Sequence, residues 1–515
     1  MERRDYLELM TGQIRCKKMC PVIAKEVEDH IEDQKQVFMA EGMKEEEAEK
    51  AAVEEMGDPV EVGVEMDQIH RPKMPWKAIF VIALMQILSG MFAAFFLKQN
   101  ESYGYIAGIR QIFRLAMAFS VMILVCYMDY SWIGKHARLL AGSYLLFMVL
   151  MRHFFALQIN GAVRWIGVGG FIVSLSLMSW LFLPLYGAVL YRYRGEGYGA
   201  VLKAIVWMLL IAGILITCPD LVMAGTVGLS CVFMLMLALE KGWYQVVVTK
   251  VMTGIGISVV GVPVGILAYF FFFGAEYQKS RILAMFAVNK SQMMEGTTLG
   301  AVRELLSKCM AVGRATGVED FWTGDRISSA DYMMLGIAGY CGILVMVLCI
   351  AIIAGLLCWF LRSALKQKNQ LGMMMGFGCV MVLAIQFLLS LMANIGVSGF
   401  GQGAWCLFFG YGRSGQMVSA VLMGILLSIY RHQNVTPELV VEKRAVASYD
   451  RRKKRRNKML VCDYIVERID GDYAMLKRTN LLEEEEKMVA RALLPEEIRE
   501  GSRLHYELLQ YTIVE

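Results

Sequence analysis

The stretch NGAVRWIGVGG, residues Asn160–Gly170, combines side chains that the packing of lipid-facing helices does not require. It lies between two apolar runs that are each long enough to cross a bilayer. Arg164 supplies a planar cation for a phosphate or a carboxylate, Trp165 is typical of the headgroup zone, and the glycines permit a tight re-entrant turn. The stretch predicts an anion-binding loop at a membrane surface; an interfacial loop anchored by Trp165 is the plainer alternative.

The composition indicates that the bilayer is the main solvent of this chain. Of its 515 residues, 57% are apolar, and the mean hydropathy is +0.48, well above that of a soluble protein of this length. The sequence therefore predicts an all-α polytopic membrane protein with ten transmembrane helices. Segments long enough to span are expected at 76–97, 111–128, 137–157, 171–191, 201–217, 219–239, 251–273, 332–361, 371–397 and 404–430.

Positive charge predicts the orientation of these helices. Arg71, Lys73 and Lys77 precede the first span, and further basic residues follow the second, fourth, sixth and eighth spans. Loops rich in Lys and Arg face the cytoplasm, so we expect both termini inside and the long segment 274–331 outside. The segment before the first span is charged and has no apolar run typical of a signal peptide, so no cleaved leader is expected.

Charge and cysteine usage point away from several other classes of protein. The net charge of +5 is modest and gives no indication of nucleic-acid binding. Most cysteines lie inside predicted spans, Cys16 and Cys20 stand alone, and the six His residues are scattered. We therefore expect no disulfide framework, no metal site and no cofactor.

The N-terminal segment, residues 1–72, shows helical periodicity. Helices are expected over 26–43, over 45–56, and from Asp58-Pro59 to about residue 69. The segments EDHIED, EGMKEEEAEKAAVEEMGDP and IHRPK resemble the small helical prefix domain found before bacterial permease-like membrane proteins. That resemblance implies a cytoplasmic regulatory or docking module.

The C-terminal segment divides into a basic linker, residues 432–460, and a predicted β domain, residues 461–515. The basic run Arg451–Lys458 is expected to attract anionic lipid at about 1 kcal/mol per basic residue near the surface. A β-hairpin is expected over 462–478, with further strands near 488–492 and 504–514. The pattern ERIDGDYA followed by ARALLPEEIREG is similar to a small bacterial β domain of unknown function.

Motifs along the region between the two ends carry a more specific resemblance. After NGAVRWIGVGG come CPDL at 218–221, YQKSRI at 277–282, Asp331-Tyr332, NIG at 394–396 and GYGRS at 410–414. In this order they resemble the shape, elongation, division and sporulation family, whose members include FtsW, RodA and SpoVE. The resemblance implies a transmembrane domain over 73–431 and a multi-pass protein of the bacterial plasma membrane.

The resemblance also implies an activity. The family polymerises the polyprenyl-pyrophosphate-linked precursor of peptidoglycan at the outer face, usually with a transpeptidase partner, a class B penicillin-binding protein. Because a pyrophosphate leaves during glycosyl transfer, cations must hold it at the membrane surface. The candidate cations are Arg164, Lys279 and Arg281, and the other candidate substrate contacts are Asn160, Trp165 and Asp331.

The chain departs from the family pattern in the outer loop, where the resemblance places the catalytic base. The family's presumed catalytic Asp aligns near Thr297, so the candidates are Glu295 and Asp220. Asp220 lies near a span end, where an ionisable group is usually functional or paired. Arg413 replaces a family Gly, and we hypothesise that it pairs with Asp220 or Asp331. Two further family motifs lose their acids, at Ser174–Leu177 and at Gly339-Tyr340.

Three functions stay open at this point. The first is a membrane glycosyltransferase of cell-wall synthesis that uses Glu295 or Asp220 as base. The second is a catalytically degenerate relative that binds the precursor or a partner without polymerising it. The third is a transporter of the lipid-linked precursor, given the permease-type prefix.

Overall fold

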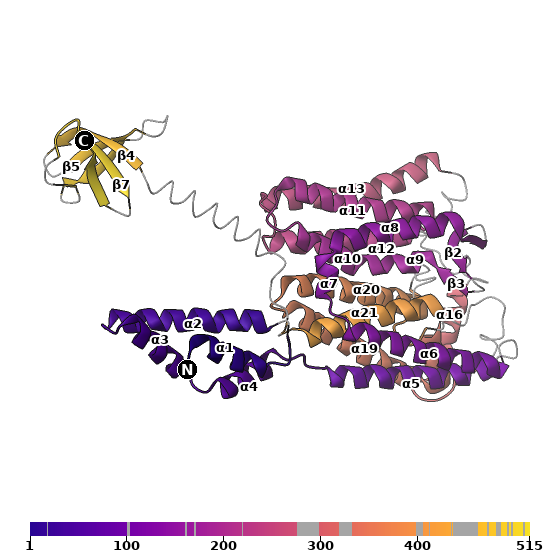
Figure 1. Cartoon of the computed structure of the whole chain (residues 1–515). Coiled ribbons are helices and arrows are strands. Elements are labelled where there is room, and N and C mark those ends of the chain that lie inside the picture. The colour runs from indigo at the N-terminus through magenta and orange to yellow at the C-terminus, as the bar shows by residue number, and fades with distance from the viewer. Residues whose placement is uncertain are drawn as a thin grey trace. The chain divides into compact units, whose positions relative to one another are not determined.

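The protein is predominantly helical, as the computed structural model in Figure 1 shows. The structure describes residues 1–17, 19–99, 104–159, 162–168, 171–218, 220–274, 298–318, 332–397, 405–410, 412–433, 435, 462–470, 473–479, 486–491, 494–495, 498–507 and 510–514. The chain divides into two compact units, Met1–Pro437 and Glu438–Glu515.

The N-terminal region contains four helices: α1 (Arg3–Gly12), α2 (Cys20–Ala40), α3 (Glu45–Glu55) and α4 (Pro59–His70). The three predicted helices are confirmed, and α1 is additional. Asp58 caps α4 by accepting from the amide of Val60, and Pro59 occupies the first helical position, where no intrahelical donor is lost. On α2, Ile23, Val27 and Ile31 repeat at four-residue spacing and face a shared core.

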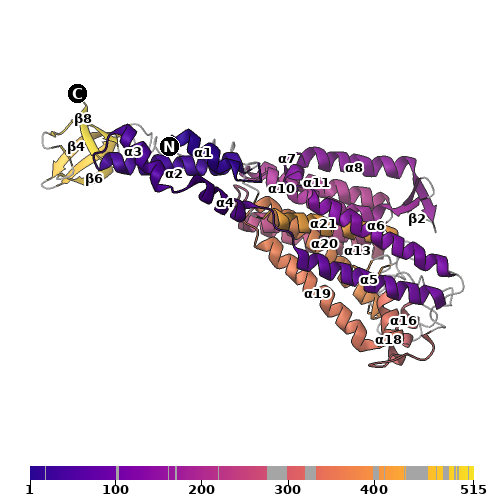
Figure 2. The ribbon, with the colours of Figure 1, turned by 60° about the horizontal axis from the view of Figure 1, so that its bottom comes forward.

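The bundle seen in Figures 1 and 2 is formed mainly by helices of the described residues between 76 and 431. They are α5 (Trp76–Gln99), α6 (Gly104–Tyr127), α8 (Ala137–Phe154), α10 (Phe182–Arg192), α11 (Tyr198–Thr217), α12 (Leu221–Glu240), α13 (Val248–Phe273), α19 (Ile343–Leu365), α20 (Gln370–Asn394) and α21 (Arg413–Arg431). Among the described residues, eight helices are long and apolar enough to cross a membrane; these are α5, α6, α9 continued by α10, α11, α12, α19, α20 and α21. Multiple spans are thus supported, while the count of ten and the orientation stay predictions.

The predicted span 171–191 is wrong in its first turn. Residues Phe171–Ser174 form a strand, β3, and only after it do α9 (Leu175–Met178), a short 3₁₀ turn (Ser179–Leu181) and α10 continue as helix. Strand β3 pairs with the preceding strand β2 (Ala162–Val168), and Ser174 then caps α9 by accepting from the amide of Leu177. An apolar run alone does not distinguish a strand from a helix.

The predicted span 332–361 is also interrupted. It consists of α18 (Met333–Cys341) and α19, separated at Gly342, whose φ is +102°. A Cβ on Gly342 would lie 2.5 Å from the carbonyl oxygen of Ala311, so only glycine fits both the backbone conformation and the space. The amides of Ile343 and Leu344 donate to the carbonyls of Met310 and Ala311. The described part of the long loop is therefore hydrogen-bonded to this helix break.

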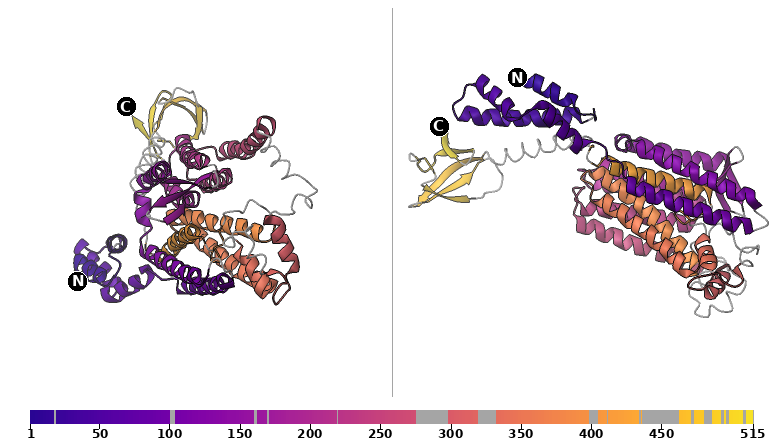
Figure 3. Two further views of the ribbon diagram at one scale, coloured as in Figure 1. Left: turned by 90° about the vertical axis from the view of Figure 1, so that its right-hand side faces the viewer. Right: turned by 90° about the horizontal axis from the view of Figure 1, so that it is seen from below.

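The long loop also contributes helix α16 (Thr298–Lys308), which packs on α18. Val302 and Leu305 of α16 share a small buried core with Leu335 of α18 and Ala393 of α20. Arg303 on the same helix donates from Nε to the carbonyl oxygen of Gly396, at 2.7 Å. Helix α16 lies at the same end of the bundle as β2 and β3 (Figures 1 and 3), which we call the hairpin end.

The C-terminal unit is a five-stranded antiparallel sheet in the order β6-β5-β4-β7-β8. Its strands are β4 (Cys462–Asp470), β5 (Tyr473–Arg478), β6 (Glu486–Ala490), β7 (Arg503–Glu507) and β8 (Gln510–Val514). The predicted hairpin is confirmed, because β4 pairs with β5 up to Asp470 opposite Tyr473. The single strand expected near 504–514 is instead two paired strands, β7 and β8.

Candidate functional site

The motif NGAVRWIGVGG forms the middle of a three-stranded antiparallel sheet at the hairpin end. Strand β1 (Ala156–Ile159) pairs with β2, and β2 pairs with β3, so that Trp165 lies opposite both Leu157 and Ser174. The two glycine-containing turns lie outside the described residues. The predicted re-entrant turn involves residues outside the described ones and stays a prediction, and the described part of the motif is strand β2, which carries Arg164.

Arg164 forms an ion pair with Asp220. The guanidinium Nη1 lies 3.7 Å from the carboxylate Oδ2, and the Arg164 side chain is 42% exposed whereas that of Asp220 is 13% exposed. The other oxygen, Oδ1, accepts from the amide of Met223 at 3.2 Å, so Asp220 is also the N-cap of α12. A carboxylate at a helix N-terminus is favoured by the cap and by the helix dipole. Asp220 thus contacts Arg164 through Oδ2, and the Arg164 side chain is 42% exposed although its Nε is buried.

A second basic residue lies close to this pair, and sequence analysis missed it. Arg152, in the last turn of α8, donates from Nη2 to the carbonyl oxygen of Thr217 at 2.5 Å. Thr217 ends α11, three residues before Asp220. A basic residue at a span end is usually explained by contact with headgroups, and so Arg152 gave no distinctive signal.

The structure leaves several predicted site residues outside its description. Asn160, Lys279, Arg281, Glu295 and Asp331 are outside the described residues, so whether they meet Arg164 stays a prediction. Of the two pairings hypothesised for Arg413, the one with Asp220 is wrong, and the one with Asp331 lies outside the described residues. The charged partner of Asp220 is Arg164, because the cap at the start of α12 orients its carboxylate toward strand β2.

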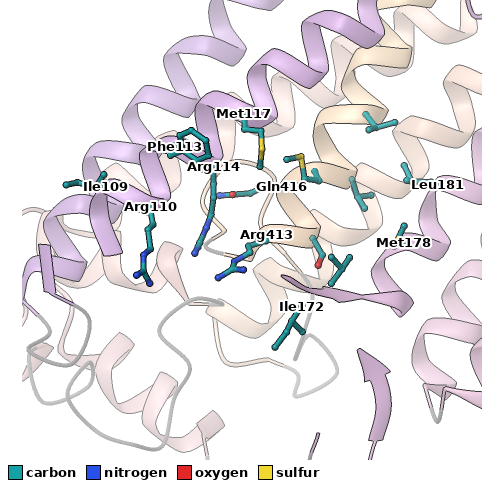
Figure 4. Close-up of a pocket in the computed structure, with 15 residues that line it drawn as sticks. Ile109, Arg110, Phe113, Arg114, Met117, Ile172, Met178, Leu181, Arg413 and Gln416 are labelled. Atoms are coloured by element: carbon teal, nitrogen blue, oxygen red, sulfur yellow. The ribbon is translucent and has the colours of Figure 1, made fainter. Parts of the chain in front are cut away.

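Arg413 lies instead in the lining of a pocket of about 700 Å³ at the hairpin end (Figure 4). Side chains of α6, β3, the 3₁₀ turn and α21 form its walls, and Arg110 and Arg114 lie beside Arg413 in the lining. Helix α6 packs closely on α21, since a Cβ on Gly424 would lie 2.8 Å from the carbonyl oxygen of Met122. The pocket itself gave no sequence signal, because its residues come from distant segments.

The GYGRS motif is positioned by hydrogen bonds to the end of β3 and to α6. The hydroxyl of Ser414 accepts from the amide of Ser174 at 2.9 Å. The carbonyl oxygen of Gly410 accepts from Nε2 of Gln416, at 2.6 Å, and from Nε2 of Gln111, at 3.3 Å. These contacts fix the start of α21, and hence Arg413, relative to the small sheet.

The NIG motif has a positioning role as well. Asn394 is fully buried, its Oδ1 accepts from the amide of Leu335, and its Nδ2 donates to the carbonyl of Ser390. Two residues later, the carbonyl of Gly396 receives the hydrogen bond from Arg303. The motif therefore connects α20 to α18 and to the loop helix α16.

Comparison with known proteins agrees with this arrangement of motifs. The model of the FtsW/RodA/SpoVE cell cycle protein family matches residues 72–435. The chain belongs to this family. It is accordingly a multi-pass protein of the plasma membrane.

Two curated relatives and one solved structure are similar to the chain. It is 24% identical over 320 residues, 58% of this chain and 71% of the relative, to a probable peptidoglycan glycosyltransferase FtsW of Idiomarina loihiensis. It is 24% identical over 298 residues, 56% of this chain and 71% of the relative, to the probable peptidoglycan glycosyltransferase FtsW of Synechocystis. A chain in a structure of a peptidoglycan synthase complex shares the fold, with a TM-score of 0.56 at 18% identity over 70% of this chain and 98% of that one.

Proposed function

We propose that this family member acts in bacterial peptidoglycan synthesis as a glycosyltransferase on the polyprenyl-pyrophosphate-linked precursor, at the outer face of the membrane. The observation that carries the proposal is the contact between Arg164 and Asp220. It joins two motifs that the family resemblance selected independently, and it lies at the bundle end expected to face outward. The FtsW relatives named as probable peptidoglycan glycosyltransferases support the same activity.

In this proposal Arg164 contacts the pyrophosphate of the donor. A guanidinium binds phosphate oxygens through parallel N–H donors, and these bonds strengthen as charge develops on the leaving group. The 42% exposure of Arg164 gives a ligand access, and Asp220 restricts its position. Lys279 and Arg281 are proposed as further phosphate contacts, and Asn160, Trp165 and Asp331 as further parts of the substrate site.

The proposed base is Glu295, which would accept the proton of the acceptor hydroxyl. Asp220 is the weaker candidate, because its Oδ1 caps α12 and its Oδ2 faces Arg164. A carboxylate with both oxygens engaged in this way is better suited to orienting Arg164 than to accepting a proton. We therefore propose a positioning role for Asp220.

One observation favours a second candidate function, that of a relative that binds the precursor without polymerising it. Gly339 and Tyr340 stand where the family resemblance leads one to expect acids. A Cβ on Gly339 would lie 2.6 Å from Val318, and the Tyr340 ring packs between Arg314, at 5.3 Å, and Phe95, at 5.4 Å. These residues serve packing, which is consistent with lost catalytic groups.

Partners follow from the same proposal. We propose a transpeptidase partner of the class B penicillin-binding type, supported by the likeness to a chain of a peptidoglycan synthase complex. We propose that Arg451–Lys458 contacts anionic lipid, that residues 1–72 form a cytoplasmic regulatory module, and that residues 461–515 form a separate binding domain.

The experiment that tests the proposed function supplies purified full-length protein with labelled lipid-linked precursor, with and without a candidate transpeptidase. Glycan polymer that disappears in Glu295→Gln supports glycosyl transfer with Glu295 as base. Polymer that persists in that variant contradicts the role of Glu295. Precursor binding without polymer supports the second candidate, and movement of precursor across vesicles without polymer would indicate a transporter.

A further inference from the structure

The segment that follows α16 contains a short, exposed apolar loop. We call residues 310–312, with the sequence Met-Ala-Val, the 310–312 loop. All of its side chains are exposed, Met310 by 50% and Val312 by 67%. Single exposed apolar side chains are ordinary at a protein surface, but successive ones form a continuous patch that favours an apolar environment.

Backbone hydrogen bonds hold the 310–312 loop against the first turn of α19. The amides of Ile343 and Leu344 donate to the carbonyl oxygens of Met310 and Ala311, at 3.0 and 3.1 Å. These bonds satisfy backbone groups that would be costly to bring into an apolar medium without a partner. They also place the loop at the same depth in the bilayer as the start of α19.

The start of α19 carries side chains that face lipid. Helix α19 is one of the helices long and apolar enough to cross a membrane, and Leu344, Val347 and Leu348 in its first two turns are 59%, 49% and 60% exposed. Its 23 residues extend about 35 Å, slightly more than the ~30 Å hydrocarbon layer. The first turn therefore lies near the boundary between acyl chains and headgroups. Figure 2 shows α16 and α18 at this end of α19.

Basic residues flank the 310–312 loop on both sides. Lys308 is 44% exposed and lies 2.7 Å from Glu304 on α16, and the guanidinium of the exposed Arg314 lies 5.3 Å from the ring centroid of Tyr340. An apolar segment between basic residues suits a bilayer boundary, because the apolar side chains enter the acyl region while the cations stay among the headgroup phosphates. Continuity with the lipid-facing side of α19 favours lipid over a protein partner as the occupant of this patch.

We propose that the 310–312 loop inserts into the leaflet at the hairpin end and anchors α16 to the bilayer. Met310 and Val312 contact acyl chains beside Leu344. Because α16 shares a buried core with α18 and α20, the anchor holds this part of the long loop at the membrane surface. Such an anchor is independent of glycosyl transfer, since it requires only the lipid of the bilayer.

The first test uses the photoreactive residue p-benzoylphenylalanine in the full-length protein, in nanodiscs of phosphatidylcholine with radiolabelled acyl chains. Val312→p-benzoylphenylalanine should crosslink to lipid about as efficiently as the same replacement of Leu348. Replacement of Ser307, an exposed residue of α16, is the matched control and should give at least about five-fold less lipid adduct. Equal lipid adduct at Val312 and Ser307 would overturn the inference, as would an adduct between two copies of the chain in place of lipid.

A charge substitution gives a second readout that needs no crosslinker. If the loop lay in water, Val312→Asp would have little effect, because Val312 is already 67% exposed. In lipid the carboxylate is unfavourable, so in nanodiscs the amides of Ile343 and Leu344 should exchange at least about three-fold faster. Ser307→Asp should leave their exchange unchanged. Parent-like exchange of these amides in Val312→Asp would contradict insertion.

Discussion

Arg164 and Asp220 are separated by more than fifty residues in the chain, yet Nη1 of one lies 3.7 Å from Oδ2 of the other. The pair connects strand β2 to the first turn of α12. Because Arg164 is partly exposed, the ion pair itself contributes little to folding, at most about 1 kcal/mol. Its consequence is geometric, since it fixes the position of a partly exposed cation relative to α12.

Asp220→Asn separates the two roles of Asp220. Asparagine is as good an N-cap as aspartate, so Asp220→Asn should unfold at a temperature close to that of the parent. Asp220→Ala removes the cap and should lower the free energy of unfolding by about 1 kcal/mol. Precursor binding should weaken several-fold in Asp220→Asn, because Arg164 is no longer held. In an Arg164→Gln background the same change should have no further effect on binding. An additive loss in the double variant would show that Asp220 acts independently of Arg164.

Gly342 should be intolerant of substitution. Gly342→Ala places a Cβ 2.5 Å from the carbonyl of Ala311 at a φ of +102°, and we expect destabilisation of at least about 1–3 kcal/mol. Gly355→Ala is the matched control on α19, because a Cβ there meets no atom within 4 Å. Hydrogen exchange of residues 309–318 should rise in Gly342→Ala alone. Equal exchange in the two variants would argue against the role assigned to the helix break.

Val435, four residues beyond the end of α21, belongs to the buried core of the N-terminal helices together with Tyr6 and Met10. Val435→Asp should expose that core, because burying a Val contributes about 1.5–3 kcal/mol and a buried charge is costlier still. Hydrogen exchange of α1 and α2 should increase. Val37→Asp, at a position that is 50% exposed, should leave exchange unchanged, and a rise in both variants would contradict the specific contact.

The pair between α2 and α3 predicts a pH dependence. Lys35 Nζ lies 2.9 Å from Glu45 Oε1, and this hydrogen bond lowers the pKa of Glu45 below its ordinary value of 4.5 and raises the pKa of Lys35 above 10.5. A carboxyl group whose pKa is lower in the folded than in the unfolded state stabilises the fold at pH values above its unfolded-state pKa. This stabilisation is lost as the pH falls through its folded-state pKa.

Amide hydrogen exchange at α2 and α3, corrected for the pH dependence of the intrinsic exchange rate, should therefore become faster below about pH 4.5. Lys35→Met removes the pair and should make exchange at α2 and α3 less dependent on pH below about 4.5. Lys50→Met, on α3, should leave the pH dependence unchanged. A profile of Lys35→Met identical to that of the parent would refute this origin of the pH dependence.

Particular residues show how far the sequence predicts this fold. Long apolar runs predicted the eight helices of the described residues that are long and apolar enough to span, though not all of their bounds, and Asp58-Pro59 predicted the start of α4. The strand Phe171–Ser174 escaped prediction because its pairing with β2 is a tertiary contact. The helix break at Gly342 was not predicted because a single glycine in an apolar run is usually tolerated in a helix. In each case the deciding atoms belong to another segment.

Contacts between distant segments also determine the arrangement of the site. The sequence identified Arg164 and Asp220 separately and suggested Arg413 as a partner of Asp220 or Asp331. Asp220 contacts Arg164 instead, since the orientation of its carboxylate is set by the cap on α12. The pocket of Arg413 could not be predicted, because its walls come from α6, β3 and α21. Residue type and local spacing therefore predict candidate groups, whereas their pairing depends on helix packing.

The central claim is that the pyrophosphate of the lipid-linked precursor contacts Arg164. It is tested most directly by equilibrium binding of labelled precursor to the full-length protein, comparing Arg164→Gln with the control Arg362→Gln. Arg164→Gln should weaken binding by about 10-fold, the effect of one charge-assisted contact, while the control should bind like the parent. Equal affinity in both variants, or no precursor binding by the parent, would contradict it.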